Sequence, residues 1–349
     1  MTRIVMQPSG KAVDCAYGDT VLMALEKAGY ALPNNCRAGA CGECKVKVTS
    51  GQFDQGMVLD MALSQDERKQ GYGLMCMAKP ISEELVIEWG TLDAKPKLFP
   101  PREDALFVVT DKRPIAARVV ELRLRPVGQP VRYWPGQYVT IGNPRADIPA
   151  RAYSISNAPR PDGELVLQVA RADGGVTSNW IHDQLAVGEN VKISGAYGTF
   201  IGDPSVDTPV LCIAAGTGLA PVLALAEAAL RRGFKKPVTM LFSARTREDV
   251  YSQGMMAWWR TKHRNFDYKV TLTREQAEGF LAGRIDAVLP QLFKDLSKHT
   301  IFVAGSPEFV DTCVAAAKKQ GAVDELIHTE GFFAQQQPVV ADADHLLPV

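Results

Sequence analysis

The sequence predicts a multidomain chain of α+β and α/β class, because its hydrophobic pattern changes twice along 349 residues. Residues 1–91 combine short strands with one amphipathic helix and predict a small α+β domain. Residues 104–205 hold regularly spaced strands separated by Gly, Pro and Asp turns, which indicate a closed antiparallel barrel. Residues 206–335 alternate apolar strands with helical segments, the pattern of a doubly wound parallel sheet. A proline-containing linker over 92–103 and an irregular tail over 336–349 complete the predicted division.

The predicted elements follow from apolar periodicity. A helix is expected over 20–28, where apolar residues recur at helical spacing. The predicted strands are 4–6, 12–16, 45–48 and 85–87 in the first domain, 105–110, 117–126, 137–141, 165–170 and 190–194 in the second, and 210–214, 238–242, 268–273 and 300–304 in the third.

Charge and composition exclude several classes of partner. The chain carries 39 Lys+Arg and 39 Asp+Glu, and this neutral balance argues against nucleic acid or an anionic membrane as the main partner. There is no run of 18 apolar residues, and the N-terminus begins with a strand-like pattern in place of a signal peptide. Seven cysteines suit a reducing compartment, so we expect a cytoplasmic protein.

Four cysteines have the spacing of a metal-cluster motif. Cys36, Cys41 and Cys44 form C-x4-C-x2-C, and Cys76 follows after 31 residues, as in the ligands of a plant-type [2Fe–2S] cluster. The glycines and alanines between them would let backbone N–H groups approach the inorganic sulfides. A structural zinc site or reduced surface thiols are the alternatives. The three other cysteines are predicted to be buried small residues: Cys15, Cys212 and Cys313.

A strand, a glycine turn and a helix start follow one another over 211–221. The turn, Gly216-Thr217-Gly218, would expose backbone N–H groups and a helix N-terminus to a pyrophosphate. It is not the full G-x-G-x-x-G pattern, and an ordinary strand–helix turn is the alternative.

Two segments of the predicted barrel have the residue types that a flavin needs. Arg151, Tyr153 and Ser154 place a cation, a ring and a hydroxyl on one short extended segment, although alternation would point Ser154 away from the other two. A glycine turn with hydroxyls at 174–180 leads into an apparent helix, a pattern typical of a phosphate cradle. Each segment alone could be an ordinary strand or a capped helix.

Taken together, these motifs resemble the iron–sulfur flavoprotein reductases of bacterial multicomponent oxygenases. The resemblance covers about residues 1–333, and the cysteine motif is its most specific part. It implies a plant-type ferredoxin β-grasp domain, a six-stranded antiparallel FAD barrel and a doubly wound NAD-binding domain. It further implies that FAD, a [2Fe–2S] cluster and NADH are the cofactors, with NADPH less favoured.

The resemblance assigns roles to individual residues. It implies cluster ligation by Cys36, Cys41, Cys44 and Cys76. It implies that FAD is bound by Arg151, Tyr153, Ser154, Gln168, Val169, Ala170, Gly175, Val176, Thr177 and Ser178. It implies that the nicotinamide dinucleotide is bound by Gly216, Thr217, Gly218, Ser243, Arg245, Gly305, Ser306 and Pro307. The implied catalytic residues are Ser154, Glu330 and Phe332, with Phe332 covering the flavin until nicotinamide displaces it.

Three residues keep an alternative interpretation. Glu330 could be a surface carboxylate, and Phe332 could simply pack the last strand. Members of the family often have Cys-Gly where this chain has Ala304-Gly305, so the role of that position is in doubt.

The expected function is NADH-dependent electron transfer through FAD and the cluster to a terminal oxygenase, a transient protein partner. We expect a monomer that binds neither nucleic acid nor membrane. The alternatives are the reductase of a sugar-nucleotide deoxygenase or another iron–sulfur system, and a non-enzymatic electron carrier.

Overall fold

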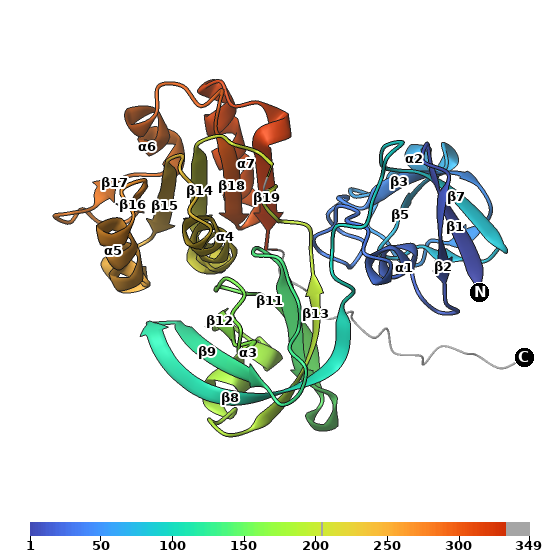
Figure 1. Ribbon diagram of the computed structural model, residues 1–349, viewed down its shortest axis with the longest axis horizontal. Helices are drawn as coiled ribbons and strands as arrows, with labels where there is room; N and C mark the ends of the chain where they lie inside the picture. The colour runs from blue at the N-terminus through green and yellow to red at the C-terminus, as the bar shows by residue number, and fades with distance from the viewer. Residues whose placement is uncertain (204, 333–349) are drawn as a thin grey trace, which may run out of the picture.

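The computed structural model describes residues 1–203 and 205–332, so the predicted tail over 336–349 lies outside the described residues. Three main sheets follow one another along the chain and form three lobes, which run from blue to teal, from teal to green and from olive to red in Figure 1. The predicted fold class is confirmed, whereas the exact domain boundaries stay a prediction.

The first sheet, with strand order β2-β1-β7-β3-β5, packs against one short helix, α1 (Val21–Lys27). Thr20 caps this helix by accepting a hydrogen bond from the Met23 backbone N–H, so the helix begins one residue after the predicted start. The remaining elements are β1 (Thr2–Gln7), β2 (Lys11–Cys15), β3 (Lys45–Ser50), β4 (Phe53–Asp54), α2 (Gln65–Lys69), β5 (Tyr72–Leu74), β6 (Lys79–Pro80) and β7 (Glu84–Glu88).

The second sheet is antiparallel and six-stranded, in the order β11-β10-β13-β8-β9-β12. Its elements are β8 (Arg102–Ala116), β9 (Val119–Pro126), β10 (Tyr138–Asn143), η1 (Pro144–Ala146), β11 (Ile148–Ser154), β12 (Leu165–Ala170), α3 (Val176–Asp183) and β13 (Asn190–Tyr197). Irregularities in the pairing of β8, β10 and β13 allow the sheet to curve. The edges then meet at a single bridge, Ile155 to Leu167, so the closure is less complete than the predicted closed barrel.

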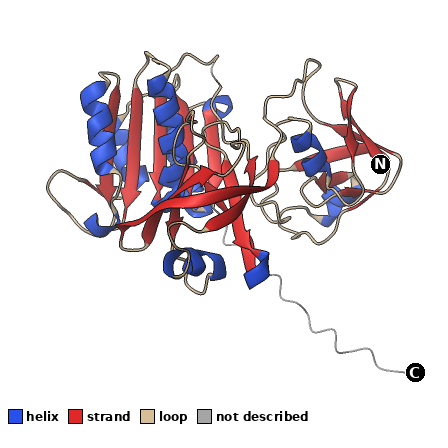
Figure 2. Cartoon of the chain, turned by 60° about the horizontal axis from the view of Figure 1, so that its bottom comes forward, coloured by secondary structure: helices blue, strands red, loops and turns tan. Residues whose placement is uncertain are grey.

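The third sheet is parallel throughout, in the order β17-β16-β15-β14-β18-β19. Helices lie on both of its faces (Figure 2): α4 and α5 pack on one core cluster, α6 and α7 on the other. The strand order reverses between β14 and β18, the place where such sheets bind ligands. Its elements are β14 (Val210–Ala215), η2 (Gly216–Gly218), α4 (Leu219–Arg231), β15 (Val238–Ala244), η3 (Arg247–Asp249), α5 (Gln253–Lys262), β16 (Phe266–Leu272), β17 (Leu281–Ala282), α6 (Ile285–Leu292), β18 (Thr300–Gly305), α7 (Pro307–Lys319), η4 (Asp324–Leu326) and β19 (Ile327–Gly331).

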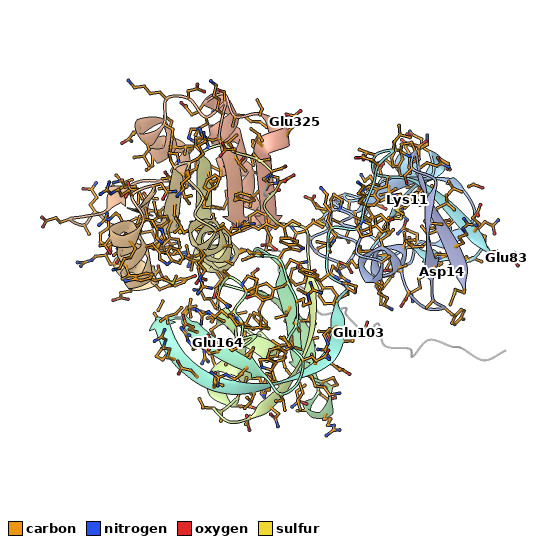
Figure 3. All side chains as sticks on the ribbon, viewed as in Figure 1. Lys11, Asp14, Glu83, Glu103, Glu164 and Glu325 are labelled. Atoms are coloured by element: carbon orange, nitrogen blue, oxygen red, sulfur yellow. The ribbon has the colours of Figure 1, made fainter. Side chains whose placement is uncertain are left out.

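The predicted linker is fastened to both of its neighbours. The backbone N–H groups of Lys97 and Leu98 donate to the Gly29 carbonyl of the first domain at 2.8 and 2.9 Å. The Trp134 indole of the barrel donates to the Lys97 carbonyl at 2.9 Å and stacks on Phe99. Figure 3 labels Glu103, just after the linker, on the side of the barrel nearest the first domain. The linker is therefore part of the packed structure.

Candidate functional site

A cavity of about 630 Å³ lies where the barrel, the cysteine loop and the end of β19 meet. Predicted flavin residues line it from β11, β12 and the start of α3: Arg151, Tyr153, Ser154, Gln168, Ala170, Gly175, Val176, Thr177 and Ser178. Glu330 and Phe332 line it from the end of β19, and Asn35 and Cys36 from the cysteine loop. Val169 is placed elsewhere, because its side chain is buried in the core of the barrel.

Arg151, Tyr153 and Ser154 reach the same cavity although strand alternation would separate them. β11 ends at Ser154, which pairs with Tyr138 of β10, and the next residue bridges to β12 instead. With this change of partner at the strand end, Ser154 lines the same cavity as Arg151 and Tyr153.

The start of α3 forms a tight polar turn. The Ser178 hydroxyl accepts from the Ala172 N–H at 3.1 Å, and a side chain at Gly175 would meet that hydroxyl oxygen at 2.7 Å. The Thr177 hydroxyl donates to the Pro149 carbonyl and fixes α3 to β11. Gly175 provides no side-chain cap, so the first N–H groups of α3 remain available to an anionic ligand such as a diphosphate.

Three buried polar atoms of the cavity wall have no hydrogen-bond partner among residues 1–203 and 205–332: the Tyr138 hydroxyl, Gln168 Oε1 and Glu330 Oε2. Buried polar groups are normally paired, so a cavity with three such atoms suits a ligand with both apolar rings and polar edges. The isoalloxazine and phosphates of FAD fit this description. The sequence did not predict that Tyr138 lines this cavity. It placed Tyr138 in a strand over 137–141, but it did not show which strands would pair with that strand.

Glu330 is buried, which rules out its interpretation as a surface carboxylate. Burial raises the pKa of Glu330 to about 8, so the cavity holds a protonated carboxyl at neutral pH. A protonated carboxyl can donate a hydrogen bond, and one placed beside a cofactor is a common feature of functional sites.

The glycine turn after β14 lies at the carboxyl edge of the parallel sheet. Gly216, Thr217 and Gly218 form η2, which the Tyr251 hydroxyl holds by donating to the Gly216 carbonyl at 2.8 Å. The same edge carries the other predicted dinucleotide residues: Ser243, Arg245, Gly305, Ser306 and Pro307. Ser306 also caps α7 by accepting from the Phe309 N–H. The structure thus brings together the residues that the sequence predicted for one nucleotide.

Gly218 has no room for a side chain, because an added Cβ would lie 2.2 Å from the Ala304 carbonyl oxygen. We expect Gly218→Ala to destabilise the chain by about 1–3 kcal/mol through overpacking and to weaken NADH binding. Thermal unfolding and an NADH titration measure both effects. Gly128→Ala is the matched control, because an added Cβ there meets nothing within 4 Å. Equal melting temperatures for the two variants would contradict the prediction.

The cysteine loop directs backbone N–H groups at sulfur. Cys36 Sγ accepts from the N–H groups of Ala38, Ala40 and Cys41 at 3.3–3.4 Å. Gly39 adopts a positive φ of 68°, and a side chain there would lie 2.9 Å from a Val58 methyl carbon. The loop can therefore wrap closely around an anionic centre only with glycine at this position.

The four cysteines lie in two contacting pairs. The Cys41 N–H donates to Cys36 Sγ at 3.3 Å, and the Cys76 N–H donates to Cys44 Sγ at 3.4 Å. The Cys41 thiol lowers the pKa of Cys36, and the Cys76 thiol lowers that of Cys44. Within residues 1–203 and 205–332, no group of three or more His, Cys, Asp or Glu side chains is gathered around one point. Two pairs of thiols suit two irons with two cysteine sulfurs each, which favours a [2Fe–2S] cluster over one zinc ion.

Known protein families match the chain in the order of its sheets. Residues 4–80 match a 2Fe-2S iron-sulfur cluster binding domain, residues 107–201 an oxidoreductase FAD-binding domain, and residues 212–315 an oxidoreductase NAD-binding domain. The predicted cofactors, FAD, a [2Fe–2S] cluster and NADH, are thereby confirmed.

Similarity to individual proteins extends over nearly the whole chain. The reductase subunit of an aromatic O-demethylase from Amycolatopsis sp. is 32% identical over 327 residues, which are 93% of this chain and 96% of that one. This chain belongs to the iron–sulfur flavoprotein reductases of multicomponent oxygenases. A second relative of the reductase is the reductase component of phenol 2-monooxygenase from Pseudomonas sp., 30% identical over 335 residues, 95% and 94% of the two chains.

Solved structures agree with the assignment to these reductases. The crystal structure of the Amycolatopsis cytochrome P450 reductase GcoB matches with a TM-score of 0.87 at 30% identity, covering 95% of this chain and 99% of that one. The ferredoxin reductase of carbazole 1,9a-dioxygenase matches with a TM-score of 0.77 at 25% identity, over 95% and 98% of the chains. Among the helices that the structure describes, none has both the length and the apolar character needed to cross a membrane.

Proposed function

We propose that this reductase passes electrons from NADH through FAD and its [2Fe–2S] cluster to a terminal oxygenase component. One observation carries the proposal: a single cavity brings a cluster-loop cysteine, Cys36, together with the flavin residues and Glu330. Electron transfer weakens steeply with distance, so a cluster at the wall of the flavin site is well placed to receive electrons. When bound, FAD accepts two electrons as a hydride and returns them singly, and the cluster relays single electrons.

In this proposal the barrel binds and orients the flavin. The start of α3 and Arg151 would hold the diphosphate, because backbone N–H groups and a guanidinium both favour anions. The Tyr153 ring would lie against the isoalloxazine with the Ser154 hydroxyl beside it, and Gln168 and Ala170 would line the adenine side. Phe332 would cover the ring, held by the bond from its N–H to the Gly305 carbonyl at 2.7 Å.

The carboxyl edge of the parallel sheet would bind NADH. The turn at Gly216–Gly218, followed by α4, offers N–H groups to the pyrophosphate, while Ser243 and Arg245 would contact the adenosine ribose. Thr217 lines both this turn and the flavin cavity, which supports a nicotinamide that reaches the flavin from this edge.

The four motif cysteines would hold the cluster, and its solvent side would face the oxygenase. Cys41 is half-buried. The neighbouring segment 57–61 is bonded to the cysteine loop, because the Leu59 N–H donates to the Gly39 carbonyl, and it exposes Met57, Leu59 and Met61. A small apolar patch of this kind is typical of weak, transient redox contacts. The seven cysteines are free of disulfides, which supports a cytoplasmic location, and we propose that the reductase acts as a monomer.

The purified protein tests the proposal directly. We expect flavin and iron–sulfur absorption, two irons per chain, and NADH-driven reduction of cytochrome c and of the cognate terminal oxygenase. If the purified protein lacked flavin, it could act only as an electron carrier. Zinc bound at the four thiols would contradict the proposed transfer of electrons through a cluster. Turnover with a sugar-nucleotide deoxygenase but no oxygenase would favour the alternative partner class.

A further inference from the structure

Arg37, the residue after Cys36, joins the cluster loop to the flavin barrel. Its guanidinium forms an ion pair with Glu26 of α1, whose side chain is only 4% exposed. On its other side the guanidinium carbon lies 4.5 Å from the centre of the Tyr197 ring, in β13 of the barrel. One side chain therefore contacts the interior of the first domain and the surface of the second.

The contacts of Arg37 depend on one another. Burial raises the pKa of Glu26, and the Arg37 charge opposes this rise. The second carboxylate oxygen of Glu26 has no hydrogen-bond partner in the part of the chain that the structure describes. Arg37 is thus the group that compensates a buried charge, and it is held by that charge in turn. This anchoring fixes the guanidinium in place over the Tyr197 ring, where a partly desolvated cation–π contact is strong.

The Tyr197 ring connects Arg37 to the wall of the flavin cavity through one further side chain. Tyr197 packs against Tyr138 with a centroid distance of 5.9 Å, and Tyr138 lines the cavity together with Cys36. A shift of the first domain relative to the barrel would therefore separate Cys36 from the cavity wall. The linker contacts at Gly29 and Trp134 restrain the same two domains from another position.

We propose that Arg37 is a positioning residue, which clamps the cluster loop to the barrel through Tyr197 and so sets the rate of electron passage from flavin to cluster. The inference rests on the proposed function, but it assigns Arg37 no part in flavin reduction by NADH or in ligation of iron.

The test compares Arg37→Gln with Tyr197→Leu in the holoenzyme. Both variants should lower NADH–cytochrome c turnover about tenfold, the loss expected for a desolvated cation–π contact. NADH–ferricyanide turnover, which needs only the flavin, should stay unchanged. Tyr197→Phe keeps the ring and should restore wild-type turnover, and the double variant Arg37→Gln/Tyr197→Leu should lose no more than either single one. Arg68→Gln is the control, because Arg68 forms an exposed ion pair with Asp60 in the same domain.

A second readout does not depend on catalysis. Trypsin should cut the Lys97–Leu98 bond about tenfold faster in Arg37→Gln and Tyr197→Leu, because undocking removes the hydrogen bond from the Trp134 indole to the carbonyl of that bond. Iron content should match the wild type in both. Loss of iron in Arg37→Gln with normal turnover in Tyr197→Leu would overturn the inference, and so would wild-type rates in both variants. If the proposed function itself fails, the wild type will not reduce cytochrome c, while the trypsin result still decides the clamp.

Discussion

Replacing Cys36 by alanine is expected to abolish NADH–cytochrome c reduction while leaving NADH–ferricyanide reduction largely intact. Cys36 Sγ accepts three backbone N–H bonds and lines the flavin cavity, so alanine there would remove both a proposed iron ligand and the proposed point of electron entry. Loss of outer-shell partners already lowers the activity of metal sites about 10–100-fold, so loss of a ligand should lower turnover at least about a hundredfold. Stopped-flow absorption and iron analysis measure the loss.

The matched control is Cys15→Ala in the same domain. Cys15 is buried in the core of the first domain and lies outside the cysteine motif, so this variant should keep its iron and its cytochrome c activity. Equal loss in the two variants would mean that the first domain had simply unfolded. Full cytochrome c activity of Cys36→Ala would show that Cys36 is not a ligand of the cluster.

Glu330→Gln is expected to abolish a large pH dependence of stability in the flavin-free protein. Burial holds the Glu330 pKa at about 8 in the folded chain, against an ordinary value of 4.5, so ionising it inside the cavity costs on the order of 5 kcal/mol. Because the folded-state pKa is raised, the wild type should be most stable below pH 4.5. It should lose this stability as the pH rises to about 8.

Glutamine cannot ionise, so the variant should melt about 10 °C above the wild type at pH 8.5 and show no such advantage at pH 5. Thermal unfolding across this range measures the difference. Glu325→Gln, a change at an exposed carboxyl shortly before β19, is the control and should keep the wild-type pH slope. If the melting temperature of Glu330→Gln depended on pH as in the wild type, another group would be responsible for the pH dependence.

Local sequence signals predicted most of the fold. Thr20, for example, starts a helix because a hydroxyl beside an amphipathic run is a cap, and the strands at 165–170 and 210–214 follow from short apolar runs. The contact between Cys36 and Cys41 follows from the short loop of the cysteine motif, because only four residues separate the two. These features depend on residues close in sequence.

Features that depend on contacts between distant segments could not be predicted. Nothing near Glu330 in the sequence indicates that it is buried, and nothing near Tyr138 shows which cavity it lines. The contact between Arg37 and Tyr197 joins residues of different domains. The barrel closure was overstated for the same reason, because strand spacing does not reveal how far two edges will pair.

The anchoring of Lys97 and Leu98 to Gly29 has a consequence for the delivery of electrons to the oxygenase. Gly29 has a positive φ of 82°, and a side chain there would lie 2.8 Å from the Leu98 carbonyl oxygen, so the connecting strap is seated directly on the first domain. We therefore expect the ferredoxin domain to stay beside the barrel and not to swing out on a loose tether. The bound cluster would then stay at a high effective concentration for the flavin, and each oxygenase molecule would come to it by diffusion.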